Sequence, residues 1–144
     1  MIRIQQQALE IESELEALEQ DTVGAVASFT GVVRGGDGIT EMEIECYLQL
    51  AQNELERIAN EARKRWRIED LRIWNRYGRL QVGERILFVA CASEHRRDAF
   101  ESCAFIVDKL KLRAPFWKKE IRGRDCKTWV EANLQDLKYA ERWH

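Results

Sequence analysis

Apolar residues recur at spacings of three and four in three stretches of the chain, the period of an amphipathic helix. The most regular stripe lies in residues 49–66 and consists of Ala51, Leu55, Ile58, Ala59, Ala62 and Trp66. A shorter stripe predicts a helix over 8–20. A third helix is expected to begin after Ser93, which is a good N-cap residue. It should end before Pro115, because the residue preceding a proline avoids helical angles.

Strict alternation of apolar and polar residues predicts strands over 22–34, 40–48 and 71–77. Residues 85–92 are continuously apolar apart from Arg85, so this strand is expected to be covered on both faces. Two further strands, 116–121 and 128–132, follow the third helix. Gly-rich stretches predict a turn at 35–38 and a loop at 78–83. The tail from about residue 134 is predicted to be helical and solvated.

Several of these strands follow one another without an intervening helix, which favours antiparallel pairing and an α+β fold. The 144 residues fit a single domain spanning 1–144. The longest unbroken apolar run, Ile86 to Ala92, is far shorter than the ~20 residues of a membrane span. The first residues lack the apolar core of a signal peptide. We therefore expect a cytoplasmic protein with no membrane partner.

Charge is sorted along the chain although the net charge is only −2. Residues 1–21 carry six acids and one base, whereas residues 108–127 carry eight bases and three acids. This asymmetry predicts a localised anion site and argues against a nonspecific polycation. The four cysteines lack a Cys-x-x-Cys spacing and are expected to be reduced thiols. With only two histidines, no metal site is expected.

Two segments have residue types suited to binding or transforming an anion. His95, Arg96 and Arg97 open the third helix, where free backbone N–H groups add positive character; the plainer alternative is pairing of the arginines with nearby acids. Lys111 and Lys118 flank a proline and two aromatic residues. A lysine beside apolar rings and another cation has a lowered pKa and can act as a base or nucleophile.

Alternation along 116–121 places Lys118 and Lys119 on opposite faces, so at most one of them faces a site. A third segment, Val33 to Gly38, contains Arg34 and glycines that let a ligand approach the backbone. It lacks the Gly-Lys-Ser/Thr of a phosphate-binding P-loop, and a hairpin turn is the alternative.

Three stretches together resemble the large, catalytic subunit of molybdopterin synthase. They are Phe29-Thr30-Gly31-Val32-Val33-Arg34, the run from Ala92 to Phe100 containing Ser-Glu-His-Arg-Arg-Asp, and Leu110 to Glu120 containing Arg-Ala-Pro-Phe-Trp-Lys-Lys-Glu. The resemblance covers about residues 22–133. It implies an α+β fold of the hammerhead type with a mostly antiparallel sheet and a small additional antiparallel subdomain.

The resemblance also implies a reaction and partners. The family converts a cyclic pyranopterin monophosphate into molybdopterin by sulfur transfer, a step of molybdenum cofactor biosynthesis. The sulfur arrives as the C-terminal thiocarboxylate of a small ubiquitin-like carrier ending in Gly-Gly. The large subunit forms a homodimer within a heterotetramer. No metal or other cofactor is implied, and the cysteines need not carry sulfur.

Matched position by position, the resemblance implies that Lys111 and Lys118 are catalytic. It implies substrate contacts for Arg34, Val32, Val33, His95, Arg96, Lys119 and Glu120. The sequence departs from the family pattern at Asn75, where His is frequent, and at Asn133, where Arg is frequent. The Asn133 departure concerns a contribution across the dimer.

Other functions remain open at this point. The same scaffold could be a noncatalytic module that binds a phosphate ligand or RNA, since basic residues lie near Phe116, Trp117 and Trp129. The net negative charge and the lack of a ribonucleoprotein motif argue against nucleic acid. A pure scaffold for the carrier would bind its Gly-Gly tail without turnover.

Overall fold

The computed structural model describes residues 1–123, 126–130 and 134–143. Its elements in chain order are β1 (Ile2–Gln5), α1 (Ile11–Leu18), β2 (Ala25–Val32), β3 (Ile39–Cys46), α2 (Leu48–Arg65), β4 (Asp70–Arg76), β5 (Gly78–Gln81), β6 (Arg85–Ser93), α3 (Arg96–Arg113), β7 (Phe116–Arg122), β8 (Cys126–Trp129) and α4 (Leu134–Glu141). The three long helical stripes and the alternating strands of the sequence therefore appear in the predicted order.

The strands form two sheets of different composition. One sheet has the order β1-β4-β6-β2 and the other has the order β5-β3-β7-β8. Among the described pairings, β1 with β4 is parallel and the rest are antiparallel. The α+β class with mostly antiparallel sheets is thus confirmed, and the second sheet is the additional antiparallel unit that the resemblance implied.

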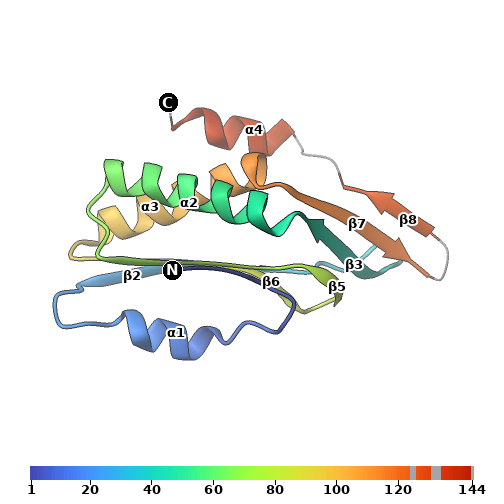
Figure 1. Ribbon diagram of the computed structural model, residues 1–144, viewed down its shortest axis with the longest axis horizontal. Helices are drawn as coiled ribbons and strands as arrows, with labels where there is room; N and C mark the ends of the chain where they lie inside the picture. Colours follow the sequence, from blue (N-terminus) through green and yellow to red (C-terminus); the bar gives the residue numbers. More distant parts are fainter. Residues whose placement is uncertain (124–125, 131–133, 144) are drawn as a thin grey trace.

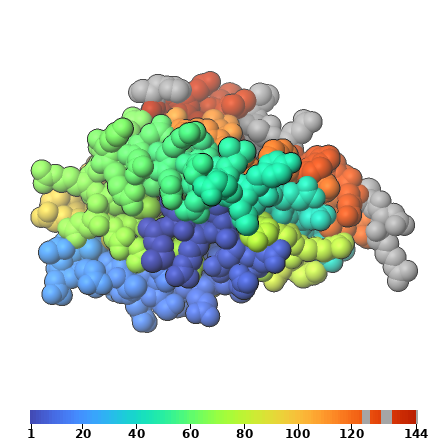
Figure 2. Space-filling view, in the orientation of Figure 1, coloured from blue at the N-terminus to red at the C-terminus, as the bar shows by residue number. Residues whose placement is uncertain are grey.

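Helices cover both faces of the first sheet. In Figure 1, α1 lies on one face while α2 and α3 lie on the other, and α4 packs beyond α3. In Figure 2 the same order is visible on the surface, with α1 along the lower edge and α2 above it. Every residue of β6 after Arg85 is buried, as predicted for a strand covered on both sides. The main core lies between this sheet and the stripe of α2.

The start of α3 differs from the sequence prediction. Ser93 was expected to cap the helix, but it pairs with Ala25 as the last residue of β6, and the cap position falls on His95. The Ser93 hydroxyl is buried and has no hydrogen-bond partner among the described residues. Gly24 explains why the strand extends this far: its N–H donates to the Ser93 carbonyl at 2.9 Å, and a Cβ at residue 24 would lie 2.1 Å from the Glu94 oxygen.

The predicted loop at 78–83 contains the short strand β5, which pairs with β3. Leu80 is fully buried there. A four-residue strand with one large inward side chain gives too short an alternation to be recognised in the sequence. The predicted last strand, 128–132, instead begins at Cys126 and ends at Trp129. Residues 131–132 and Asn133 lie outside the described residues.

The C-terminal tail forms a helix, as predicted, but it is not simply solvated. Ala140 is buried, and the Trp143 ring packs edge-on against Trp66 and Phe105 at centroid distances of 5.5 and 5.7 Å. The tail is therefore docked on α2 and α3. In the part of the chain that is described, no helix is both long and apolar enough to cross a membrane.

Candidate active site

Two lysines seven residues apart line one hollow of about 320 Å³ at the end of α3. Lys111 lies on the last turn of α3, and Lys118 lies on β7. The chain leaves the helix at Ala114, passes Pro115 and returns as β7, so the two side chains converge. Further lining residues come from α3 and its C-terminal end, from β4, β6 and β7, and from the C-terminal segment: Asn75, Leu87, Leu110, Leu112, Ala114, Phe116, Val130 and Asp136. We call this the lysine hollow.

Lys118 is the more buried of the two lysines. It lies opposite Ile44 of β3, on the inner face of the second sheet. Burial and, to a smaller extent, the positive charge of Lys111 lower the pKa of Lys118, and Asp136 opposes them; the net result is a pKa of about 8. An amine with this pKa exchanges its proton near neutral pH, as general acid-base catalysis requires.

Lys111 is exposed, and its Nζ lies 6.0 Å from the centre of the Phe29 ring. The helix turn that carries it is held firmly. The Arg113 guanidinium donates to Glu54 at 2.8 Å and to Glu61 at 2.6 Å, which ties the end of α3 to α2. Lys111 is thus positioned by a fixed backbone while its ammonium remains accessible to a ligand.

Arg34, Val32 and Val33 lie at the end of β2 that is closest to the lysine hollow. Gly31 pairs with Leu87, which lines the hollow. Arg34 is exposed and makes no ion pair within the described residues, so its guanidinium is available for an anion. Val33 is buried, and its N–H and C=O bond to Glu84 and Gly83 at 2.8 and 2.9 Å. The Val33 N–H is therefore already occupied, which weakens its predicted substrate contact.

His95 and Arg96 do not reach the lysines of the same chain. They lie at the opposite end of α3, and the 15 residues from Arg96 to Lys111 span roughly 22 Å of helix. Both side chains are exposed. The Nε2 atom of His95 lies 3.6 Å from a carboxylate oxygen of Glu94, and the Arg97 guanidinium lies 3.7 Å from the carboxylate of Glu101. Within one chain, the expectation that His95 and Arg96 share a pocket with Lys111 is wrong.

Lys119 also lies outside the lysine hollow. Its Nζ is 4.2 Å from the centre of the Trp129 ring and 3.3 Å from Glu45, on the opposite face of β7 from Lys118. This confirms the prediction from alternation, and it does not fit the implied contact of Lys119 with a substrate held by Lys111 and Lys118. Glu120 shares the face of Lys118 but pairs with Arg122 at 3.7 Å and does not line the hollow.

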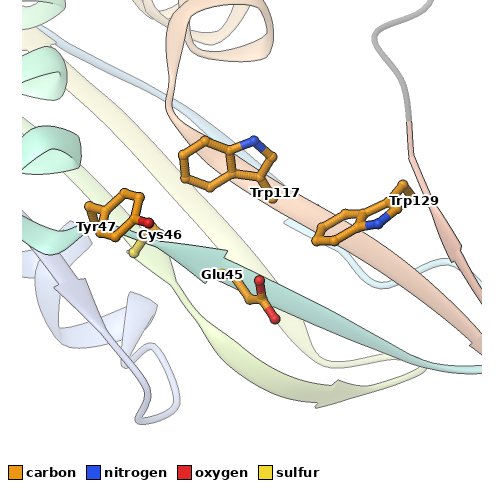
Figure 3. Close-up of a pocket in the computed structure, with 5 residues that line it drawn as sticks. All are labelled: Glu45, Cys46, Tyr47, Trp117 and Trp129. Carbon is orange, nitrogen blue, oxygen red and sulfur yellow. The ribbon is translucent and has the colours of Figure 1, made fainter.

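The face of Lys119 has a separate groove of about 410 Å³, lined by Glu45, Cys46, Tyr47, Trp117 and Trp129. We call it the aromatic groove. Figure 3 shows Trp117 and Trp129 on the neighbouring strands β7 and β8, with Tyr47 just beyond β3. The Tyr47 and Trp117 rings meet edge-on at 5.8 Å. Glu45 lines this groove, which disfavours a nucleic-acid backbone there.

A family model described as "MoaE protein" matches residues 4–113. The chain belongs to the MoaE family. Its relatives include proteins named "Molybdopterin synthase catalytic subunit" from Mesorhizobium japonicum (44% identical; 99% of this chain, 92% of the relative) and Escherichia coli (42%; 87% and 85%). The resemblance drawn from the sequence motifs is confirmed.

Solved structures agree with this membership in MoaE. A molybdopterin biosynthesis MoaE protein from Burkholderia ambifaria superposes with a TM-score of 0.85 at 42% identity, covering 99% of this chain and 97% of the other. A molybdopterin synthase structure from Staphylococcus aureus superposes with a TM-score of 0.83 at 30% identity, and the match covers 90% of this chain and 96% of the other. A complex of subunits 1 and 2 of a molybdopterin-converting factor from Helicobacter pylori, at 22% identity and 0.77, shares the fold.

Two polar residues that line the lysine hollow of this MoaE protein, Asn75 and Asp136, were not predicted as site residues. Asn75 is buried on β4, and its amide donates to the Arg76 carbonyl at 3.0 Å. Its only signal in the sequence was its departure from the family pattern. Asp136 comes from α4. It lies in a polar stretch that the sequence pattern marks as solvated, so nothing local pointed to it.

The thiols differ in environment from the lysines. Burial raises the pKa of Cys91 to about 11 and that of Cys103 to about 12, so both remain protonated near neutral pH. Neither lines the lysine hollow. In the described part of the chain, no group of three or more His, Cys, Asp or Glu side chains is arranged to hold a metal ion.

Proposed function

We propose that this MoaE protein is the catalytic subunit of a molybdopterin synthase and transfers sulfur to a cyclic pyranopterin monophosphate. The observation that carries the proposal is the convergence of Lys111 and Lys118 in one hollow. An exposed ammonium and a half-buried amine with a pKa of about 8 give that hollow both anion affinity and proton-transfer capacity. The curated names of the relatives point to the same activity.

The proposed sulfur donor is the C-terminal thiocarboxylate of a small ubiquitin-like subunit ending in Gly-Gly. Such a tail is narrow and flexible, so it suits a hollow that opens at the surface. Lys111 would assist the chemistry at the carbonyl of the carrier terminus or of the substrate, either by proton transfer or as a transient nucleophile toward the acyl group. Lys118 in its protonated form would stabilise negative charge that develops on oxygen or sulfur. The reaction would take place in the cytoplasm.

We further propose that the chain works as a homodimer within a heterotetramer. Arg34 follows the end of β2, where Gly31 pairs with Leu87 of the lysine hollow, whereas Arg96 is roughly 22 Å from Lys111 along α3 and His95 directly precedes it. If Arg34, His95 and Arg96 all bind the phosphate of one substrate, the last two must come from the second copy. This arrangement would explain why exposed cations stand at a helix start, where a positive charge is unfavourable.

The direct test replaces Lys111 by Ala and measures molybdopterin formation from the cyclic precursor and thiocarboxylated carrier. We expect turnover to fall by about 100-fold or more, a typical loss for an acid-base or nucleophilic group. Lys64→Ala, on the exposed surface of α2, is the matched control and should retain activity. Wild-type turnover in Lys111→Ala would overturn the catalytic role.

Two binding measurements separate this proposal from the alternatives. Carrier binding without turnover by the wild-type protein would indicate a scaffold. RNA binding that persists at physiological salt, again without turnover, would indicate a nucleic-acid module. We expect turnover together with no RNA binding under those conditions.

A further inference from the structure

The C-terminal helix brings a carboxylate into the lysine hollow. Asp136 of α4 lines it together with Lys111 of α3 and Lys118 of β7. Three ionisable side chains from three separate elements therefore meet in one hollow of about 320 Å³. Two of them are cations, and the third has the opposite charge.

Contacts at its far end hold α4 in this place. The Trp143 indole N–H donates to Asp108 of α3 at 2.6 Å, and the Arg65 guanidinium of α2 donates to the Trp143 carbonyl at 2.5 Å. Arg142 pairs with Asp108 at 3.1 Å. Together with the ring contacts of Trp143, these bonds fix the helix that carries Asp136.

We propose that Asp136 is a positioning residue for the sulfur-transfer reaction: it acts through Lys118 by holding the ammonium charged in the lysine hollow. This inference rests on the proposed function. Without a nearby carboxylate, a half-buried amine beside a second lysine would lose its proton too readily to stabilise developing negative charge.

The charges around Lys118 leave Asp136 as the group suited to this role. Lys111, from α3, has the same sign as Lys118. On β7, Glu120 shares the face of Lys118 but is engaged by Arg122. The neighbours on β3 and β4 are Ile44 and the neutral Asn75. The pKa of Lys118 agrees with this assignment: burial and Lys111 lower it, whereas Asp136 raises it.

Asp136 should also weaken substrate binding, and this second effect distinguishes the proposed role from a purely structural one. A carboxylate in the hollow repels a phosphorylated substrate while it supports Lys118. Removing its charge should therefore separate the two kinetic constants. We expect kcat to fall at alkaline pH, while KM for the cyclic precursor does not rise. General loss of structure would lower kcat at all pH values.

The experiment compares Asp136→Asn with Glu141→Gln, which removes an exposed carboxylate from the same helix outside the hollow. Turnover of the assembled enzyme is measured from pH 6.5 to 9.5. Titration of Lys118 is followed by NMR of isotopically labelled lysines, with Lys118→Arg assigning the signal. We expect Asp136→Asn to move the alkaline limb and the Lys118 midpoint down by about 0.5 pH units or more, with no movement in Glu141→Gln.

Unchanged midpoints in Asp136→Asn, with an active wild-type enzyme, would overturn the inference and leave the proposed function intact. An equal shift in Glu141→Gln would also overturn it, because the effect would then come from net charge alone. A wild-type protein that forms no molybdopterin would instead overturn the proposed function, and the NMR titration would still decide whether Asp136 sets the charge of Lys118.

Discussion

At the scale of single residues, withdrawing the Lys118 ammonium from water costs folding free energy. Its strand, β7, lies between β3 and β8, and its side chain shares the lysine hollow with residues of α3 and α4. The pKa of Lys118 is lowered from 10.5 to about 8. A protein that carries such a group sacrifices stability, because the folded state must desolvate an ammonium. A buried lysine of this kind is typical of a functional site.

Replacing Lys118 by Met should therefore stabilise the fold at pH 7, by on the order of 2 kcal/mol. Below pH 8 both folded and unfolded chains hold the proton, so the wild type bears the full cost. Between about pH 8 and 10.5 the folded state releases its proton first, and wild-type stability rises relative to the variant. The advantage of Lys118→Met should shrink across this window.

Urea unfolding of both proteins at several pH values measures this difference, with Lys64→Met as the baseline for an exposed lysine. An advantage that stays constant from pH 7 to 10 would show that Lys118 is not desolvated in the folded state.

At the scale of elements, the docking of α4 matters most, because it carries Asp136 to the hollow. Trp143 should hold this helix through its contacts with Trp66, Phe105 and Asp108. Trp143→Ala removes them, and we expect a loss of about 1–3 kcal/mol in unfolding free energy, less than for a fully buried Trp. Hydrogen exchange across residues 136–141 should accelerate more than exchange in α2. Equal protection in both proteins would mean that α4 is held by other contacts.

Elements with a strong internal period were predictable from the sequence, and those defined by partners were not. The stripe of α2 and the apolar run of β6 specify their own burial, so both were found with nearly correct bounds. The strand β5 was missed because its identity depends on pairing with β3. The cap at Ser93 was misplaced because pairing with Ala25 extends β6 beyond the local signal.

The sequence predicted the two lysines of the candidate site but not the residues that other elements bring to it. Lys111 and Lys118 were correctly predicted to lie together, because Pro115 ends α3 between them and the following strand folds back. Asp136 was not found, because its approach depends on a long-range anchor at Trp143. The separation of Arg96 from Lys111 could have been inferred, since one continuous helix of this length keeps its ends roughly 22 Å apart.

At the scale of the whole molecule, sulfur should pass from carrier to pterin without a cysteine of this chain. Cys91 and Cys103 are buried, with pKa values raised to about 11 and 12, and neither lines the lysine hollow. A variant with all four cysteines replaced by Ala should keep most of its turnover per folded molecule, although lost packing at the two buried sites should lower its stability. A folded but inactive variant would reveal a thiol relay.

The central claim is that one positively charged hollow, completed by a second copy, binds the phosphorylated pterin. The most direct measurement is a crystal structure of the assembled protein with the cyclic pyranopterin monophosphate bound. We predict the pterin against Lys111 and Lys118, and its phosphate between Arg34 of one chain and His95 and Arg96 of the other. A pterin bound instead in the aromatic groove, between Tyr47, Trp117 and Trp129, would contradict the account.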